Sequence, residues 1–389
     1  MINSGSSSLK FSLLDPESAN ISASGIAERL RTAQASLRLT DLHGAKQEEN
    51  LPAADHRVAL LRAIEILSGN ATLEVKAIGH RVVHGGEYFR SAALITDEVL
   101  QRIEDLASLA PLHNPANAQG IRVATELFPG KPQVAVFDTA FHQTLPPYAF
   151  HYPIPYDYYE RYRVRRYGFH GTSHQYVSQE AAKRLEKRFD EVQLISAHLG
   201  NGCSVTAIRS GKSVDTTMGL TPLEGLAMGT RSGDVDPNLH LFLQNHAKLS
   251  LQEITDLLNR KSGLLGVSGE SHDMRMVAAA ATKGNARAAL AIDIFCYRVA
   301  RAILGLAAGL TAIDAVIFTG GIGENDAAAR AKVLVEHLTI LKPKLDPNRN
   351  KQHGKESGGR ITADSGLQCL VIPTNEELMI ANETVRLIS

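Results

Sequence analysis

Hydrophobic and polar positions alternate from the start of the chain. In "INSGSSSLKFSLL", Leu9 and Phe11 fall on one face of an extended segment, and Lys10 and Ser12 fall on the other. The pattern predicts a half-buried strand after a Gly-Ser turn. The turn is either a polar entry to an ordinary strand or an anion site, in which hydroxyls, backbone N–H groups and the Lys10 ammonium face one point.

Strand-like and helix-like segments alternate along the rest of the chain, which predicts an α/β fold. The segment 348–366 is polar and is predicted to be a surface loop. The strand-like segments are "VKAIGHRVVHGG", "VAVFDTAFH", "EVQLISAHLGNGCSVTAI" and "DAVIFTGGIGEN", and the helix-like ones are "SHQYVSQEAAKRLEKRF" and "AIDIFCYRVARAILGLAAGL".

The two halves of the chain resemble each other. "INSGSSSLKFSLL" and "AHLGNGCSVTAI" both consist of a Gly-rich turn followed by an apolar alternation, so that Asn3 corresponds to His198 and Gly5 to Gly200. "VAVFDT" has a similar partner in "AVIFTGG". Chance similarity between Gly-rich turns is the alternative. We favour an internal duplication, with one Gly-rich hairpin in each half.

Composition narrows the function classes. The chain has 389 residues, which predicts two domains, and its 41 Lys and Arg residues balance 41 Asp and Glu residues. This balance argues against nucleic-acid and anionic-membrane partners. The three cysteines form no CxxC pair, and the apolar run 302–313 is too short to span a bilayer. A cytoplasmic enzyme and a cytoplasmic scaffold both fit.

Four familiar motifs are absent. "RSGKS" lacks the first glycine of a phosphate-binding P-loop, because Thr206 stands there, and "GNGCSV" has Val205 where a dinucleotide fingerprint needs a small residue. There is no H-E-x-x-H or G-x-S-x-G motif. The two Gly-rich hairpin turns remain, and if they faced each other they would cradle a polyphosphate with backbone N–H groups.

Acid and base residues gather at strand ends and beside glycines. Asp138 closes a buried strand, where ligands of α/β proteins bind. Arg81 lies near another strand end, and His170 and Arg231 lie in Gly-flanked loops. Singly, each histidine can be a hydrogen-bonded structural imidazole and each arginine a surface ion pair. Together they favour a functional site.

At this point the sequence resembles the acetate kinase family, which belongs to the superfamily of sugar kinases, actin and heat-shock chaperones. The resemblance covers nearly the whole chain. It rests on "NSGSSSLKF", "GHRVVHGGE", "APLHNPAN", "VAVFDTAFHQTLP", "RRYGFHGTSH", "HLGNGCSV", "DTTMGLTPLEGLAMGTRSGDVDP", "KSGLLGVSG", "FTGGIGEN" and "IPTNEEL". It implies two duplicated ribonuclease H-like domains with a cleft between them, 1–145 with 374–389 and 146–373.

The resemblance also implies a reaction: ATP and acetate give acetyl phosphate and ADP by direct in-line transfer, with Mg²⁺ (or Mn²⁺), in a cytoplasmic homodimer. It implies roles for individual residues. Arg81 would hold acetate, Asp138, His170 and Arg231 would be catalytic, and Asn3 and Glu376 would bind the metal. The phosphates would bind Lys10, His198, Leu199, Gly200, Asn201 and Gly202, and the adenosine would bind Asp273, Met274, Arg275, Gly321, Ile322, Gly323, Glu324 and Asn325.

The resemblance places the acyl pocket at Val83, Leu112, Phe169 and Pro222. Val83 is the bulkier residue at its position, which favours acetate over propionate. The chain departs from the family pattern at three places. Only Met1 and Ile2 precede Asn3, so either the true start lies upstream or the first strand is nearly absent. Cys203 follows the second Gly-rich turn, where its thiol is expected to react with thiol reagents. Lys261 stands where the family has a glutamate, and no function is assigned to this change.

Three alternatives remain. A propionate kinase of the same family would use the same residues with a larger acyl pocket. A nonenzymatic ATP-binding scaffold would need the phosphate turns but not Arg81, His170 and Arg231. A phosphotransferase with a phosphorylated carboxylate or His170 would replace direct transfer by two steps.

Overall fold

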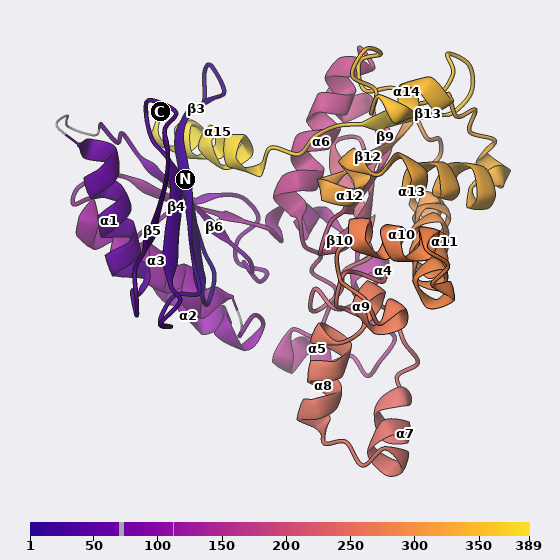
Figure 1. The fold of residues 1–389 in the computed structure, drawn as a ribbon, viewed down its shortest axis with the longest axis horizontal. Helices are drawn as coiled ribbons and strands as arrows, with labels where there is room; N and C mark the ends of the chain where they lie inside the picture. Colours follow the sequence, from indigo (N-terminus) through magenta and orange to yellow (C-terminus); the bar gives the residue numbers. More distant parts are fainter. Residues whose placement is uncertain (70–73, 112) are drawn as a thin grey trace. The chain divides into compact units, whose positions relative to one another are not determined.

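The computed structural model describes residues 1–69, 74–111 and 113–389. The chain divides into two compact units, unit 1 (Met1–Phe141 with Asn375–Ser389) and unit 2 (His142–Thr374). These bounds lie within four residues of the division expected from the resemblance. The C-terminal helix therefore belongs to the first unit, and Figure 1 shows it in yellow beside the indigo strands.

Unit 1 is built on an eight-stranded sheet in the order β5-β4-β3-β2-β1-β6-β8-β7. The strand β1 is only three residues long, as expected, and it pairs antiparallel with β2 and parallel with β6. The elements are β1 (Ile2–Ser4), β2 (Ser8–Asp15), β3 (Asn20–Glu28), β4 (Ser36–Thr40), β5 (Lys46–Asn50), α1 (His56–Ser68), β6 (Ile78–Val82), β7 (Ala93–Leu94), α2 (Asp97–Asp105), α3 (Asn114–Leu127), β8 (Gln133–Phe137) and α15 (Glu376–Ile388).

The two faces of this sheet pack against different helices. Ile2, Leu9 and Phe11 are buried in one core with apolar residues of α1 and α3, as the alternation along β2 predicts. On the opposite face, Val134 and Val136 pack against α15. The expected polar face of β2 is confirmed at the exposed Lys10, whereas Ser12 is buried.

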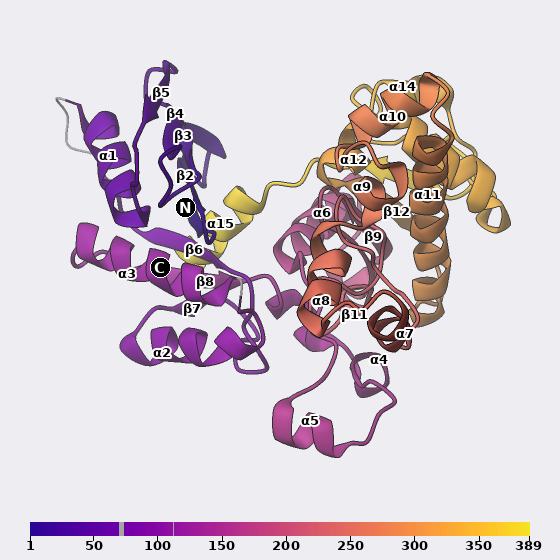
Figure 2. The same cartoon turned by 60° about the horizontal axis from the view of Figure 1, so that its bottom comes forward.

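Unit 2 is built on a five-stranded sheet in the order β11-β10-β9-β12-β13, with α6 and α11 on opposite sides of it (Figure 2). Its strands are β9 (Gln193–Leu199), β10 (Cys203–Arg209), β11 (Lys212–Thr216), β12 (Ala315–Thr319) and β13 (Gln368–Val371). Its helices are α4 (Pro147–Phe150), α5 (Asp157–Tyr162), α6 (Gly171–Arg184), α7 (Leu239–His246), α8 (Leu251–Arg260), α9 (Gly263–Ser268), α10 (Met274–Thr282), α11 (Ala286–Leu306), α12 (Gly320–Asn325), α13 (Ala327–Ala331) and α14 (Pro347–Lys351).

The two sheets share one topology. In each, an antiparallel hairpin with a Gly-rich turn (β1–β2 and β9–β10) is followed by two parallel strands, β6 and β8 in unit 1 and β12 and β13 in unit 2. The predicted equivalence of the two hairpins is confirmed. The predicted equivalence of "VAVFDT" (β8) and "AVIFTGG" (β12) is wrong. Because β12 lies next to β9 as β6 lies next to β1, β12 is equivalent to β6, and β8 is equivalent to β13.

Two local predictions also need correction. "DAVIFTGGIGEN" was predicted to be a strand followed by a turn, but "GGIGEN" is the helix α12, which begins directly after β12. The polar segment 348–366 is only partly on the surface, because Ile361 and Thr362 are fully buried. Asn350 anchors this segment by accepting a hydrogen bond from the buried Arg330 (Nε–Oδ1 2.9 Å). Among the described residues, no helix is long and apolar enough to cross a membrane.

Candidate active site

The register of unit 1 gathers three of the predicted site residues on one face of the sheet. Asn3 lies opposite Lys10 in the β1–β2 pair, and Ile2 lies beside His80 in the β1–β6 pair, so Asn3, Lys10 and Arg81 share a face. The first turn of α15 covers that face: Lys10 Nζ lies 2.6 Å from Glu377 Oε1, and Arg81 Nε lies 3.9 Å from Glu376 Oε2. Residues from three strands and the C-terminal helix thus meet there.

Arg81 and Asp138 form an ion pair in which both carboxylate oxygens accept hydrogen bonds. Arg81 donates from Nη2 to Asp138 Oδ2 (2.7 Å) and from Nε to both carboxylate oxygens (3.1 Å each). Asp138 is 2% exposed, and burial raises its pKa even though the Arg81 guanidinium opposes the shift. The attraction of Asp138 in turn raises the pKa of Arg81. The pair occupies the Nε–Nη2 edge of the guanidinium and leaves the Nη1 side for a ligand.

Asn3 and Glu376 supply oxygen ligands of the kind that Mg²⁺ prefers. Mg²⁺ is commonly held by one or two carboxylates together with substrate phosphates, so a small protein donor set fits it. In the described ranges, no group of three or more His, Cys, Asp or Glu side chains could hold a metal ion by itself. The two residues therefore fit a metal that is bound jointly with a phosphate ligand.

The expected acyl-pocket residues do not lie in one unit. Val83 follows β6 in unit 1, where its backbone N–H donates to Asn117 Oδ1 (3.0 Å). Phe169 and Pro222 lie in unit 2, and the Phe169 side chain is 2% exposed. Leu112 lies outside the described residues.

The β9–β10 turn of unit 2 brings two cationic or donor side chains together. The turn is closed by a hydrogen bond from Gly200 N to Gly202 O (3.0 Å). A Cβ at Gly202 would lie 3.2 Å from His170 Nε2 and 3.3 Å from Arg231 Nη2. The glycine therefore leaves room for a small ligand between the imidazole, the guanidinium and the turn.

Arg231 is a half-buried cation. It donates from Nη1 to the Pro222 carbonyl oxygen (2.6 Å), and burial lowers its pKa. In the part of the chain that the structure describes, it forms no ion pair with a carboxylate. A guanidinium keeps its proton at any physiological pH, so this half-buried positive charge is available to bind an anion from outside the chain.

His170 and His198 stack face to face beside the turn. Their ring centroids lie 4.4 Å apart with an interplanar angle of 24°, and His170 Nδ1 is hydrogen-bonded to Ser204 Oγ (2.9 Å). The neighbouring His174 bonds Ser196 and Ser204 through its two ring nitrogens, and burial lowers its pKa well below the ordinary value. His174 is therefore a neutral structural residue that fixes the serines behind the turn.

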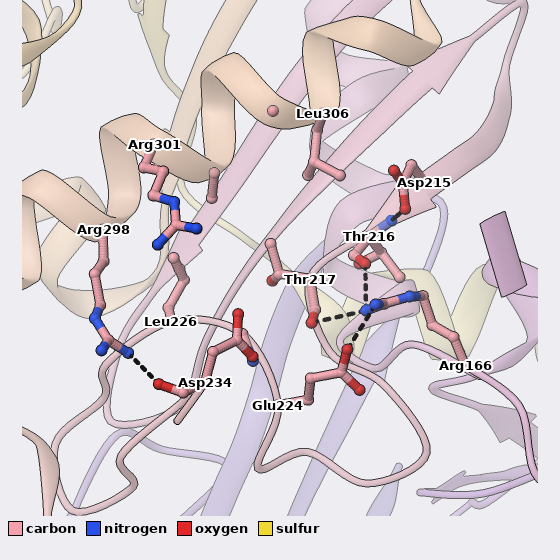
Figure 3. Close-up of a pocket in the computed structure, with 13 residues that line it drawn as sticks. Arg166, Asp215, Thr216, Thr217, Glu224, Leu226, Asp234, Arg298, Arg301 and Leu306 are labelled. Carbon is pink, nitrogen blue, oxygen red and sulfur yellow. Dashed lines mark hydrogen bonds and ion pairs between the residues drawn. The ribbon is translucent and has the colours of Figure 1, made fainter. Parts of the chain in front are cut away.

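The loop that carries Pro222 is held by Arg166, which the sequence analysis did not single out. Arg166 Nη1 donates to the carbonyl oxygens of Thr216 and Thr217 (2.9 Å each), and Nη2 donates to Glu224 Oε1 (2.6 Å), as Figure 3 shows. These contacts border a cavity of about 250 Å³. The second arginine of "RRYGFHGTSH" thus anchors this loop, and its place in that motif was the available signal.

The expected adenosine-binding residues adjoin the same turn. A Cβ at Gly320 would lie 2.8 Å from Leu199 O, whereas a Cβ at Gly321 would meet nothing within 4 Å. Among these residues, the carboxylate of Glu324 points inward and accepts from Gly320 N (2.9 Å) and Thr374 N (3.0 Å). Ile322 and Gly323 continue α12, and Asn325 Nδ2 donates to Gly321 O (3.0 Å).

The second adenosine segment begins α10. Asp273 caps this helix and pairs with Arg275 (Nη2–Oδ2 2.6 Å), which lowers the pKa of Asp273 to about 2. A Cβ at Gly229 would lie 3.2 Å from His272 O and 2.2 Å from Asn201 Oδ1, so the segment before Asp273 borders the β9–β10 turn. Met274 is buried and anchors the first turn of α10.

The expected reactivity of Cys203 is wrong. Its side chain is fully buried, and its Sγ contacts Gly200 O at 3.1 Å. Burial raises its pKa to about 12, so the thiolate that reacts with thiol reagents hardly forms at neutral pH.

Comparisons with known proteins agree with this geometry. The model of the acetokinase family matches residues 1–382. An acetate kinase from Desulfitobacterium hafniense is 51% identical over 395 residues, which cover 100% of this chain and 98% of the relative. The crystal structure of a propionate kinase from Francisella tularensis superposes with a TM-score of 0.94 at 44% identity (99% of this chain, 98% of that one), and that of Porphyromonas gingivalis acetate kinase with 0.93 at 40% identity (100% and 98%). The chain belongs to the acetokinase family.

Proposed function

We propose that this chain is an acetate kinase, which transfers the terminal phosphoryl group of ATP to acetate and gives acetyl phosphate and ADP reversibly. The observation that carries the proposal is the half-buried Arg231 guanidinium, which has no carboxylate partner in the described residues and lies with His170 beside Gly202. In the transition state, the charge of the transferred phosphoryl group is spread over its equatorial oxygens. A fixed guanidinium and an imidazole donor stabilise that charge without reorganisation.

Acetate is proposed to bind Arg81 through the Nη1 side of the guanidinium. Asp138 holds the other edge, which fixes the plane of the guanidinium and therefore the direction in which a bound carboxylate points. Orientation matters because one acetate oxygen must attack phosphorus in line. Acetate is already ionised at neutral pH, so the reaction needs no general base, and we assign Asp138 an orienting role.

Asn3 and Glu376 are proposed to hold Mg²⁺, which Mn²⁺ can replace because it accepts the same oxygen ligands. The ion supplies charge neutralisation at the phosphates. The chain contributes the oxygens of Asn3 and Glu376 and keeps Lys10 beside them, where its ammonium pairs with Glu377. Lys10 is proposed to exchange this half-buried partner for a phosphate oxygen.

The nucleotide is proposed to bind unit 2. His198 to Gly202 would contact its phosphates, and the segments 273–275 and 321–325 would contact its adenosine. The open space at Gly321 supports this assignment, since a flat ribose or base needs backbone without side chains. The proposal requires the acetate residues of unit 1 and the phosphate residues of unit 2 to act on the same pair of substrates.

Unit 2 is also proposed to form a homodimer in the cytoplasm. Several of its aromatic side chains are solvent-exposed in the single chain, among them Tyr148 (81% exposed), Tyr162 (63%) and Phe242 (57%). Aromatic residues are enriched in interfaces. Light scattering on the purified protein measures its mass in solution, and a mass of one chain at micromolar concentration would contradict the dimer.

Propionate is the second candidate substrate, because the structure of a propionate kinase superposes closely on this chain. Trapping of the acyl phosphate with hydroxylamine, run in parallel on acetate, propionate and butyrate, distinguishes the candidates. We expect acetyl hydroxamate to form fastest. Faster formation from propionate keeps the chemistry and overturns the substrate. No hydroxamate from any acid, with folded protein that binds ATP, favours the nonenzymatic scaffold.

A further inference from the structure

Two hydroxyl groups connect the end of unit 2 to one of the histidines beside the β9–β10 turn. Thr374 Oγ1 donates a hydrogen bond to Ser173 Oγ (2.8 Å), and Ser173 Oγ lies 2.8 Å from His198 Nδ1. Ser173 is in the first turn of α6 and is fully buried, and Thr374 is the last residue of unit 2. None of the roles considered above uses Ser173 or Thr374.

The order of donors fixes where the imidazole carries its proton. A serine hydroxyl has one proton to donate. Because Thr374 donates to Ser173, the Ser173 proton is left for His198 Nδ1, which is its only other partner in the described part of the chain. A neutral imidazole that accepts at Nδ1 carries its proton at Nε2.

The tautomer of His198 matters for anion binding because Nε2 lies beside the glycine turn. A Cβ at Gly200 would lie 3.9 Å from His198 Nε2 and 3.9 Å from Gly321 N, so the ring nitrogen and a backbone N–H border the glycine turn together. Stacking on His170 holds the plane of the His198 ring. In the opposite tautomer, Nε2 would present a lone pair to an anion and would repel it.

The backbone of Thr374 is held by the carboxylate of Glu324, which also contacts the start of α12. Glu324 Oε1 accepts from Thr374 N (3.0 Å) and from Gly320 N (2.9 Å). The same side chain therefore sets the start of α12 and the backbone that presents the Thr374 hydroxyl. This arrangement explains why Glu324 points inward.

We infer that Ser173 and Thr374 are positioning residues that hold His198 with its proton at Nε2, so that the ring donates a hydrogen bond to a phosphate oxygen of the nucleotide. The inference rests on the proposed function for the identity of the anion. The tautomer itself is a property of the free protein, and it is measured without substrates. Removal of one neutral hydrogen bond changes equilibria by about tenfold, which sets the expected effect on rate.

The test uses nitrogen NMR of ¹⁵N-histidine-labelled protein, with His198 assigned from the spectrum of His198→Asn. We expect a protonated Nε2 and an unprotonated Nδ1 in the unsubstituted chain and in Thr374→Ser. In Ser173→Ala and Thr374→Val the signals of His198 should shift toward a mixture of tautomers, and kcat should fall roughly tenfold with a smaller change in the KM for acetate. Ser178→Ala is the matched control, because the hydroxyl of this buried serine of α6 donates to Gln175 O, within its own helix.

The outcomes separate the inference from the proposed function. Unchanged His198 signals in Ser173→Ala, or a Thr374→Ser variant that behaves as Thr374→Val, overturn the inference. A changed tautomer with an unchanged kcat overturns the role in phosphate binding. If the unsubstituted chain forms no acyl hydroxamate while its His198 carries the expected tautomer, the proposed function fails and the positioning of the ring stands.

Discussion

Asp138 binds Arg81 along the Nε–Nη2 edge of the guanidinium, with the shortest contact at 2.7 Å. The carboxylate is 2% exposed, and the arginine side chain is 23% exposed. The pair is thus a buried anion that fixes a partly exposed cation. Its function in the proposed reaction is to aim the remaining Nη1 side of Arg81.

Single substitutions at the two residues test the role of this pair. In Asp138→Asn we expect kcat to fall by about tenfold or more, because the guanidinium loses its orientation. In Arg81→Gln we expect the KM for acetate to rise and the free energy of unfolding to fall by roughly 3–5 kcal/mol, because Asp138 is left buried without its cation. Steady-state kinetics and urea denaturation measure the two effects. A kcat for Asp138→Asn close to that of the unsubstituted chain removes Asp138 from the mechanism.

Arg231→Gln should lower kcat by on the order of a hundredfold or more, because a preorganised charge at the phosphoryl group is lost. The KM for acetate should change little, since acetate is assigned to Arg81. The exposed Arg188, which pairs with Asp190 and Glu191, gives the control Arg188→Gln. Equal kinetics for the two variants would remove Arg231 from the reaction.

Gly202→Ala should abolish most activity while the protein stays folded. The added methyl group would lie 3.2 Å from His170 Nε2 and 3.3 Å from Arg231 Nη2, in the space assigned to the phosphoryl group. Gly305→Ala is the matched control: a Cβ at this position of α11 meets nothing within 4 Å, and alanine in a helix stabilises by about 0.5–1 kcal/mol. ATP binding followed by calorimetry should weaken in Gly202→Ala alone. Unaltered binding and rate in that variant would place the phosphoryl group elsewhere.

Val83→Ala should shift the preference from acetate toward propionate by roughly tenfold in kcat/KM, since one methylene in an apolar pocket is worth ~1–3 kcal/mol. Parallel hydroxamate assays on the two acids give the ratio. An unchanged ratio would mean that Val83 does not line the acyl site.

Stability should decrease in mild acid because of buried histidines. Burial lowers the pKa of His80 and of His142 to about 4 from 6.5. Such a group contributes stability above pH 6.5, and this contribution is lost as the pH falls toward 4, because the unfolded chain binds the proton first. Between pH 7 and pH 5 the loss is about 2 kcal/mol per histidine.

Urea denaturation of the unsubstituted chain and His80→Gln at the two pH values isolates one of these residues. His80 Nε2 is hydrogen-bonded to Gln133 Oε1 (2.6 Å), and the glutamine side chain retains a donor for that partner. The variant should lose about 2 kcal/mol less than the unsubstituted chain. An identical pH dependence for both proteins would show that His80 titrates normally in the folded state.

Local sequence patterns predicted the hairpins but not every strand equivalence. The alternation at Leu9 and Phe11 and the glycines of both turns are local features of the sequence. The hairpins could therefore be predicted from the sequence alone. The strands β8 and β12 are both short, apolar and fully buried, and their equivalents are decided by which strand lies alongside. The local sequence of a strand does not show which strand lies beside it in the sheet.

The site residues were predictable where glycine or a strand end marked them, as at Arg81, Asp138, His170 and Arg231. Ser173 and Thr374 carried no such mark, because their contact joins residues 201 positions apart in the chain. The edge of Arg81 that Asp138 occupies was also unpredictable, since it depends on the parallel pairing of β6 with β8. Contacts between side chains that are distant in sequence could be found only in the folded structure.

The most direct test of the central claim is phosphorus NMR of the purified protein with ATP, Mg²⁺ and acetate, followed by the reverse mixture of ADP and acetyl phosphate. The account predicts an acetyl phosphate signal that grows with ADP in the first mixture and ATP formation in the second. It also predicts that both signals almost vanish in Arg231→Gln. Hydrolysis of ATP to inorganic phosphate without any acetyl phosphate, or equal rates in the variant, would contradict the account.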